Sequence, residues 1–476
     1  MPGPTERRRP GRGPRIRTPH LHGPHLHSPR IPGGGDARLL LLARILMSGE
    51  RALVGVVVPI YLARLGYSAV KLAALFAVVA VASALLSVTI GMFSDRLGRK
   101  PFVIALPAAT AVAAAVFAVT DHTVLLFVFA ALGSFGRGGG AGSGAVGPYQ
   151  PAEQAWMAGM VSDRDRPRLF GLVASASAAG GLLGAIIAAS PLGAPAHAAG
   201  AATPATYRAA FVTAAILALA AAAVAVPVRE EHPARLAPGT KTGPVIIAES
   251  AEEPIEVDGE VDDESRAPTA SAPPPRPGHR LSHVARSLVW RLWATNVTNG
   301  IAVGLFGPFV TYWFFRRFGA DTTVVGVIYI VVNVVTIGTN LLTARIAGRF
   351  GVVPSVVVLR SIQALLLIPL ALSPTIVVAA AIYTARTGVQ RIGMAVRQSF
   401  VMTVAPPHER ARVSALSRLP SQGIAAAAPL FAGYLFEEVS LAAPFLLGAV
   451  FQLANALTFG WLFRRAAPIF RHTERP

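Results

Sequence analysis

The charged side chains that fall within apolar stretches of this sequence carry its most informative chemistry. Glu50 lies about twelve residues into one such stretch, directly before Arg51. Burial favours a neutral carboxylic acid, whereas a nearby arginine favours the carboxylate, and this balance suits reversible proton binding. Adjacent helix positions point about 100° apart, so the two side chains need not pair. The sequence therefore predicts Glu50 as a proton-carrying group, with Arg51 beside it.

A glycine-rich segment provides a second set of candidates. It extends from Gly133 to Pro151 and includes Arg137, and it is followed by Glu153 and Gln154. Glycine and proline interrupt helical hydrogen bonding, and in lipid such breaks persist only where protein or a cavity supplies partners. We expect a discontinuous helix that lines a transport path, with Glu153 as a candidate for proton coupling and Arg137 as a second charged group. In the alternative, Arg137 has a structural role and satisfies the freed carbonyl groups.

Amide and guanidinium groups are the candidates in the second part of the sequence. Guanidinium groups bind carboxylates through paired hydrogen bonds, so buried arginines favour an anionic substrate or a substrate that carries a carboxylate. The expected lining of a substrate cavity consists of Gln154, Asn296, Asn299, Asn333, Arg386 and Arg391.

These charges require apolar elements to position them. Of the 476 residues, 53% are hydrophobic and 14% are charged, a composition typical of a membrane protein. Crossing the hydrocarbon layer takes about 20 residues per helix, and this length predicts twelve spans. They begin near Leu39, Val70, Phe102, Val124, Leu169, Tyr207, Leu288, Thr322, Val352, Thr375, Val413 and Leu441.

Basic residues are distributed unevenly between the predicted loops. Most of the 43 Lys and Arg residues fall on one side together with both termini, and the opposite loops hold Arg64, Lys71, Arg208, Arg316 and Arg317. Lys and Arg accumulate in cytoplasmic loops, so we expect a multi-pass protein of the cell membrane with both termini in the cytoplasm. The same loops account for the net charge of +19, and nucleic-acid binding is not expected.

Two polar regions divide the predicted spans. Neither contains enough apolar surface to offset the entropy of an unfolded chain. We therefore expect a disordered cytoplasmic tail at residues 1–37, an N-terminal six-helix bundle at 38–228, a disordered cytoplasmic linker at 229–286, a C-terminal six-helix bundle at 287–466 and a cytoplasmic tail at 467–476.

The decapeptide GMFSDRLGRK joins the second predicted span to the third. Its motif residues are Gly91, Asp95, Arg96, Gly98, Arg99 and Lys100. Through this loop the sequence resembles the major facilitator superfamily, and in particular bacterial members that export drugs and other small molecules. The resemblance implies an all-α fold of two pseudo-symmetric six-helix bundles that open alternately to each side of the membrane. It also implies a gating role for the loop. Arg137 resembles the fourth-helix arginine of the superfamily, which implies a role in proton coupling for this residue.

Glycines in the fifth predicted span extend this resemblance. Gly171, Gly180 and Gly184 reproduce the glycine spacing of the antiporter signature found in drug-efflux members, although the later positions of that signature are alanines here. Small residues at this spacing also allow close helix packing. Both interpretations stay open, and the first favours export.

The expected function is secondary active transport of small organic molecules. We predict proton-coupled export by alternating access, carried out by a monomer in the lipid bilayer. Uptake or exchange of an organic anion is the first alternative, and a non-transporting membrane sensor or scaffold is the second. The sequence contains no cysteine and no nucleotide-binding or catalytic motif, so no enzymatic activity, metal site or cofactor is expected.

Overall fold

The computed structural model is helical throughout the part of the chain that it describes. The described residues are 34–135, 148, 150–161, 165–193, 204–229, 282–350, 352–404 and 410–464. The tail before residue 34, the linker at 230–281 and the end of the chain after residue 464 lie outside them, so their predicted disorder stays a prediction.

Helices occur in or next to every predicted span. Those of the N-terminal half are α1 (Gly34–Arg64), α2 (Ala69–Leu97), α3 (Lys100–Val119), α4 (Thr123–Gly133), α5 (Gln150–Gly159), α6 (Arg166–Ala189), the 3-10 turn η1 (Pro204–Tyr207) and α7 (Arg208–Ala225). Those of the C-terminal half are α8 (His283–Phe306), the 3-10 turn η2 (Gly307–Phe309), α9 (Val310–Phe318), α10 (Thr322–Phe350), α11 (Val352–Ala371), α12 (Ile376–Val404), α13 (Arg410–Tyr434), the π-helical turn η3 (Leu435–Val439) and α14 (Ala443–Phe463).

Length and composition identify membrane-crossing helices in both halves. Among the described helices, eight are long and apolar enough to cross a membrane. Others, such as α12, contain several arginines, and α4 is shorter. The chain is therefore an all-helical, multi-pass membrane protein, while the number of twelve spans stays a prediction.

Two of the predicted spans contain a helix end in their interior. α4 stops at Gly133, where Ser134 takes a left-handed conformation (φ 56°), and α5 begins only at Gln150. This is the place where the glycine-rich sequence predicts a break, although Arg137 lies outside the described residues. A second interruption, at η2 between α8 and α9, contains Pro308, which has no amide hydrogen to donate. The sequence analysis treated that segment as one span.

The signature decapeptide forms the end of α2 and the start of α3. Gly98 follows α2 with a φ of 89°, a conformation that residues with a side chain rarely adopt. α3 then begins at Lys100, with Arg99 as the residue before it. Gly91, Asp95 and Arg96 belong to α2, but the described part of the structure does not include their side chains.

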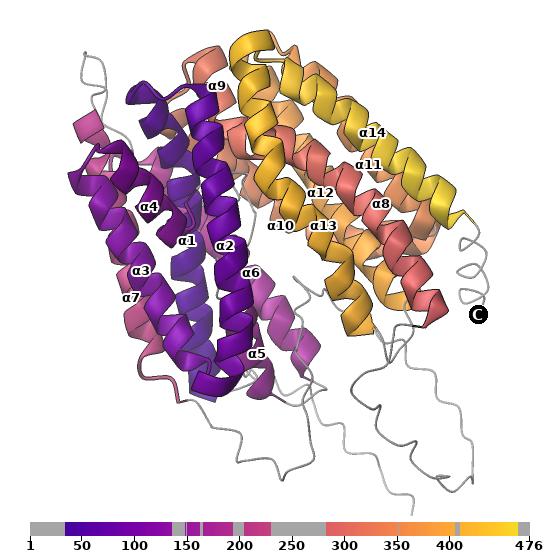
Figure 1. Ribbon diagram of the computed structural model, residues 1–476, viewed down its shortest axis with the longest axis horizontal. Helices are drawn as coiled ribbons and strands as arrows, with labels where there is room; N and C mark the ends of the chain where they lie inside the picture. The colour runs from indigo at the N-terminus through magenta and orange to yellow at the C-terminus, as the bar shows by residue number, and fades with distance from the viewer. Residues whose placement is uncertain are drawn as a thin grey trace, which may run out of the picture.

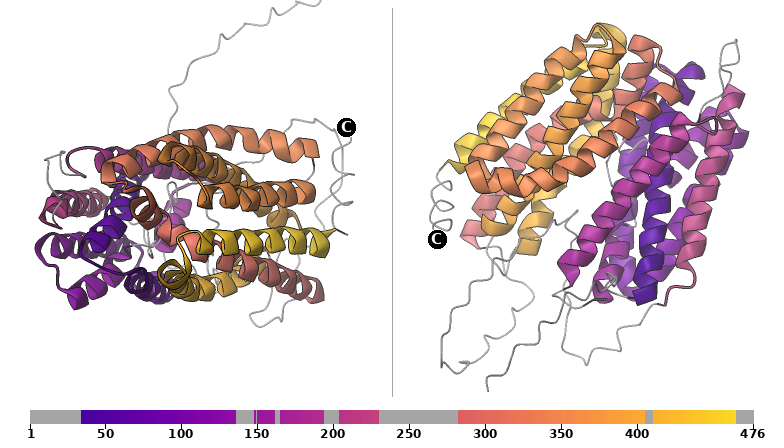
Figure 2. Two further views of the ribbon diagram at one scale, coloured as in Figure 1. Left: turned by 90° about the horizontal axis from the view of Figure 1, so that it is seen from above. Right: turned by 180° about the vertical axis from the view of Figure 1, so that it is seen from behind.

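The helices form two bundles that meet at one end and diverge at the other, as Figure 1 and the right panel of Figure 2 show. The meeting end contains the turn between α1 and α2, and we call it the closed end; the opposite end is the splayed end. One hydrophobic cluster at the closed end includes residues of both halves, such as Leu53 and Phe309. Towards the splayed end the buried residues form two separate clusters, one in each half. The chain thus has a single core at one end and two cores at the other.

Backbone contacts without intervening side chains join the halves at the closed end. Gly433 of α13 lies so close to α2 that a Cβ atom there would be 2.8 Å from the carbonyl oxygen of Ala69. Gly326 of α10 lies equally close to α6, with a hypothetical Cβ 2.6 Å from the amide nitrogen of Ala189. These glycines permit the close approach on which the closed end depends.

Candidate functional site

Glu50 occupies a fully buried position near the middle of α1. Its exposed fraction is 0%, and neither carboxylate oxygen accepts a hydrogen bond from the described residues. The residue lies about 14 residues before the end of α1 at Arg64, which corresponds to about 21 Å along the helix. A hydrocarbon layer about 30 Å thick would place it well inside the membrane, enclosed by protein.

The turn of α1 that carries Glu50 packs closely on α6. A Cβ atom on Gly184 would lie 2.1 Å from the carbonyl oxygen of Gly49, and one on Gly180 would lie 2.3 Å from that of Ile45. Gly171, in contrast, has no atom within 4 Å of such a position. Two of the three signature-like glycines therefore bring the backbone of α6 against the turn that carries Glu50.

Arg51 binds a helix end instead of its neighbour Glu50. Its guanidinium donates from Nη1 to the carbonyl oxygen of Ser134 at 3.1 Å and from Nη2 to that of Gly133 at 3.3 Å. These carbonyl groups lose their helical partners where α4 stops. Arg51 thus satisfies freed carbonyl groups, the structural role that the sequence analysis considered for Arg137.

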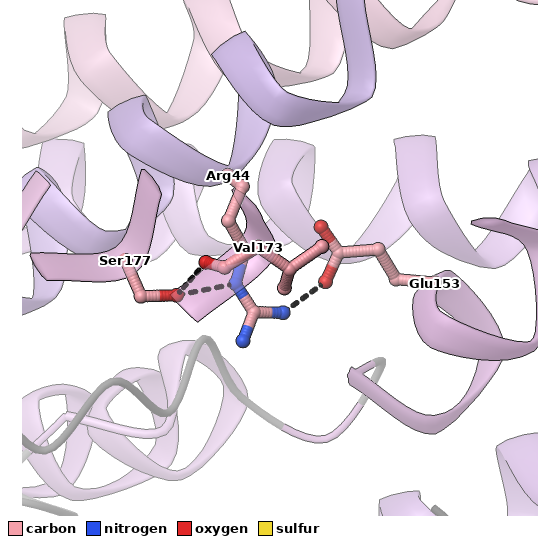
Figure 3. A network of polar contacts seen from close by, with 4 residues as sticks. All are labelled: Arg44, Glu153, Val173 and Ser177. Atoms are coloured by element: carbon pink, nitrogen blue, oxygen red, sulfur yellow. Dashed lines mark hydrogen bonds and ion pairs between the residues drawn. The ribbon is translucent and has the colours of Figure 1, made fainter. Parts of the chain in front are cut away.

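A buried ion pair joins three helices of the N-terminal half (Figure 3). Arg44 of α1 donates from Nη1 to Oε2 of Glu153 on α5 at 2.5 Å, and from Nε to Oγ of Ser177 on α6 at 2.8 Å. Ser177 in turn donates to the carbonyl oxygen of Val173 at 3.0 Å. Both charged side chains are buried. Glu153 is therefore compensated within its own half, unlike Glu50.

The corresponding interior of the C-terminal half contains arginine without a described carboxylate. Arg386 of α12 is 2% exposed, and its Nη1 donates to Oε1 of Gln390 at 3.2 Å. Its Cζ atom lies 4.4 Å from the ring centre of Phe306, a cation–π distance. The Nε and Nη2 atoms have no hydrogen-bond partner among the described residues. Arg386 thus retains donors that a bound anion could engage.

The other residues that were predicted to line the substrate cavity make separate contacts. Asn296 donates to the carbonyl oxygen of Ser417 at 2.5 Å. Asn333 donates to the carbonyl oxygen of Tyr329 in its own helix and lies beside Gly181 of α6, at the junction of the halves. Gln154 is buried, and its Oε1 has no hydrogen-bond partner in the described part of the chain. Asn299 and Arg391 are both half-buried. The described contacts do not join these six residues into one site.

The interior contains two further sets of polar contacts that the sequence did not indicate. Arg397 of α12 donates to Oδ1 of Asn296, and its place one and a half turns after Arg391 could have identified it. Thr311 contacts the hydroxyl of Tyr329 at 2.8 Å and donates to the carbonyl oxygen of Gly55 at 3.4 Å, across the two halves. No sequence pattern predicts this second contact, because its partners lie 256 residues apart.

Two helical bundles, a closed and a splayed end and buried charges at mid-depth define a multi-pass membrane transporter. The sequence matches the family model described as Major Facilitator Superfamily over residues 40–417 and 292–475, and the chain belongs to this superfamily. It is accordingly a transporter of small molecules and not an enzyme. No curated relative matches the sequence.

Solved structures confirm the fold at low sequence identity. A bacterial homologue of the human lysosomal transporter Spinster, in an inward-facing and unoccupied conformation, is 14% identical with a TM-score of 0.61, covering 93% of this chain and 98% of that one. The nucleoside transporter NupG is 12% identical with a TM-score of 0.64, covering 90% and 99%. A D-xylose–proton symporter is 14% identical with a TM-score of 0.62, covering 89% and 96%.

Proposed function

We propose that this transporter couples the export of small organic molecules to the movement of protons, and that Glu50 carries the proton. The observation that supports this role is the complete burial of Glu50 without a donor from any described residue. An unpaired buried charge costs free energy. Glu50 is therefore expected to hold a proton while it is enclosed and to release it when a conformational change admits water.

Alternating access supplies that conformational change. The contacts between the halves gather at the closed end, where they would separate if the molecule opened on that side. The helix α1, which carries Glu50, packs against α6, and α6 itself contacts α10 of the other half. Movement of one half against the other would thus change the surroundings of Glu50. A proton symporter among the proteins of similar fold is consistent with such coupling.

The distribution of basic residues supports one orientation in the membrane. We propose that the splayed end faces the cytoplasm, with both termini on that side of the cell membrane, and that the protein works as a monomer. α1 runs towards the closed end, and α14 begins near that end after η3 and runs away from it. Export is favoured by the efflux-like spacing of Gly171, Gly180 and Gly184.

Everted membrane vesicles provide the test of coupling. Respiration acidifies their interior, and acridine orange fluorescence reports any loss of the pH gradient when lipophilic cations and organic acids are added singly. We expect at least one compound to dissipate the gradient with the wild-type protein and with Glu438→Gln, an exposed control on η3. The same compound should have no effect with Glu50→Gln. A response preserved in Glu50→Gln would contradict the assigned role, and no response to any compound would contradict proton-coupled export.

Transport of an organic anion is the second candidate, and the unpartnered donors of Arg386 favour it. Proteoliposomes loaded with one organic acid and diluted into its radiolabelled form would show anion-for-anion exchange. We expect Arg386→Gln to abolish exchange if Arg386 binds the carboxylate, and Arg316→Gln, at the exposed end of α9, to preserve it. Equal exchange by both variants would exclude this role of Arg386.

A further inference from the structure

A proline near the end of α1 leaves one backbone carbonyl group without its helical donor. In an uninterrupted helix the carbonyl oxygen of Gly55 would accept from the amide four residues later. That position is Pro59, which has no amide hydrogen. Gly55 and Pro59 are both buried. A buried carbonyl group without a donor costs free energy, so the fold has to supply a donor from elsewhere.

This donor comes from the other half of the molecule. Thr311 of α9 is fully buried, and its Oγ1 donates to the carbonyl oxygen of Gly55 at 3.4 Å. The same Oγ1 lies 2.8 Å from the hydroxyl oxygen of Tyr329 on α10. A threonine hydroxyl has a single hydrogen, which points to Gly55 here, so Tyr329 is the donor in the second contact. The two hydroxyl groups thus form a directed chain from the C-terminal half to the carbonyl group that Pro59 frees.

Apolar side chains of both halves surround this contact. Val54 and Val310, the neighbours of Gly55 and Thr311 along the chain, belong to the hydrophobic cluster of the closed end. An apolar contact can separate without leaving a polar atom unsatisfied. When the closed end opens, in contrast, Thr311 moves away with its half, and the carbonyl oxygen of Gly55 then needs water as its donor. Opening therefore exchanges a hydrogen bond within the protein for one to water.

We propose that Thr311 is a positioning residue for transport, and that its hydroxyl holds the closed end shut by satisfying the carbonyl group of Gly55. Pro59 creates the need for this donor, and Tyr329 orients the hydroxyl that meets it. Because water replaces the hydrogen bond after opening, its loss should raise the open population by about threefold. The inference rests on alternating access, but it does not depend on the proposed proton coupling or on the direction of transport.

Distances between two spin labels, measured on the purified full-length protein in lipid nanodiscs, test this role. Val119→Cys and Leu372→Cys place the labels on exposed positions at the ends of α3 and α11. We expect Thr311→Val, which removes the hydroxyl but keeps the size, to increase the fraction of long distances about threefold. Thr311→Ser, which keeps the hydroxyl, should resemble the wild type. The matched control is Thr336→Val on α10, because this buried threonine donates within its own helix, to the carbonyl oxygen of Val332.

A double-mutant cycle tests whether the hydroxyl acts through this particular carbonyl group. Pro59→Ala restores an amide hydrogen, so α1 itself can satisfy the carbonyl oxygen of Gly55. Thr311→Val should therefore increase the fraction of long distances when Pro59 is present and have no further effect in Pro59→Ala. An equal increase in both backgrounds would show that the hydroxyl does not act through Gly55, and the proposal would be overturned.

A merely structural role for Thr311 predicts a different pattern. The hydroxyl would then stabilise the fold in every conformation, so Thr311→Val would lower Tm and leave the distances as they are in the wild type. That result would overturn the proposal. Equal increases in Thr311→Val and Thr311→Ser would also overturn it, because they would assign the effect to the shape of the side chain. We expect a change in distances for Thr311→Val alone, with a Tm close to that of Thr336→Val.

Discussion

The N-terminal half and the C-terminal half accommodate buried charge differently. In the first, Glu153 neutralises Arg44 directly, Arg51 binds the carbonyl groups at the end of α4, and Glu50 is enclosed without a described donor. In the second, the buried residues Arg360 and Arg386 have no described carboxylate beside them. The interior of one half therefore offers a carboxylic acid without a described donor, and the interior of the other offers guanidinium groups without a described carboxylate.

This difference assigns separate tasks to the two halves. A half with a free buried acid can exchange protons, because its charge state changes with exposure to water. A half with uncompensated buried guanidinium groups attracts anions. The two halves of the transporter therefore need not contribute equally to its function.

Removal of the carboxylate from the N-terminal ion pair should have the largest effect on stability. Glu153→Gln leaves Arg44 charged and buried, which costs about 3–5 kcal/mol when one partner of a buried pair is lost. We expect a strongly lowered Tm in detergent, measured by intrinsic fluorescence. Glu438→Gln on η3, where the side chain is exposed, should leave Tm unchanged. Equal values for the two variants would show that the pair does not stabilise this half.

Overpacking between α1 and α6 should have the second largest effect on stability. Gly184→Ala introduces a Cβ atom where the nearest oxygen lies at 2.1 Å, and such overpacking costs about 1–3 kcal/mol. Gly171→Ala in the same helix meets open space and serves as the matched control. The prediction fails if both alanines change Tm by the same amount.

An added carboxylate should make the C-terminal half resemble the N-terminal half. Gln390→Glu places an acid where Gln390 now accepts from Arg386. A guanidinium group binds a carboxylate more strongly than a neutral amide oxygen, by roughly 1 kcal/mol, so we expect a modest rise in Tm and weaker organic-anion exchange. Unchanged exchange would indicate that the anion does not use Arg386.

Loss of the hydrogen bond across the closed end should have the smallest effect on free energy. Glu437 of η3 accepts a hydrogen bond from the amide of Val70 at the start of α2, at 3.0 Å. A carboxylate at a helix N-terminus contributes up to about 1 kcal/mol, or roughly a fivefold change in populations. Glu437→Gln should therefore increase the population that is open at this end.

Spin labels can measure this population without interference from native thiols, because the sequence has no cysteine. Leu192→Cys and Val377→Cys place labels on exposed positions of the two halves. Electron–electron resonance should show a larger fraction of long distances in Glu437→Gln than in Glu438→Gln. Identical distributions would exclude a role for this contact in holding the end closed.

Local sequence patterns predicted much of the fold. The decapeptide from Gly91 to Lys100 identified the superfamily, and Gly98 adopts the positive φ that such a turn requires. The glycine-rich run marked where α4 stops. These predictions succeeded because helix ends and turns depend on neighbouring residues.

The sequence predicted few hydrogen-bond and ion-pair partners of the buried side chains, because tertiary packing determines them. The sequence left open whether Arg51 pairs with Glu50, and it did not indicate the carbonyl oxygen of Ser134, 83 residues away, to which Arg51 donates. The pairing of Arg44 with Glu153 spans 109 residues and depends on where α5 begins. The interruption at Pro308 could have been noticed from the sequence, since proline in a span removes a hydrogen bond.

The titration of Glu50 is the most direct test of the central claim that the N-terminal half carries the proton. Infrared difference spectra of the purified protein, recorded between acidic and alkaline pH, detect the C=O stretch of a titrating carboxylic acid without any substrate. We predict a band in the wild type and in Glu438→Gln that disappears in Glu50→Gln. A band that persists unchanged in Glu50→Gln would contradict the account.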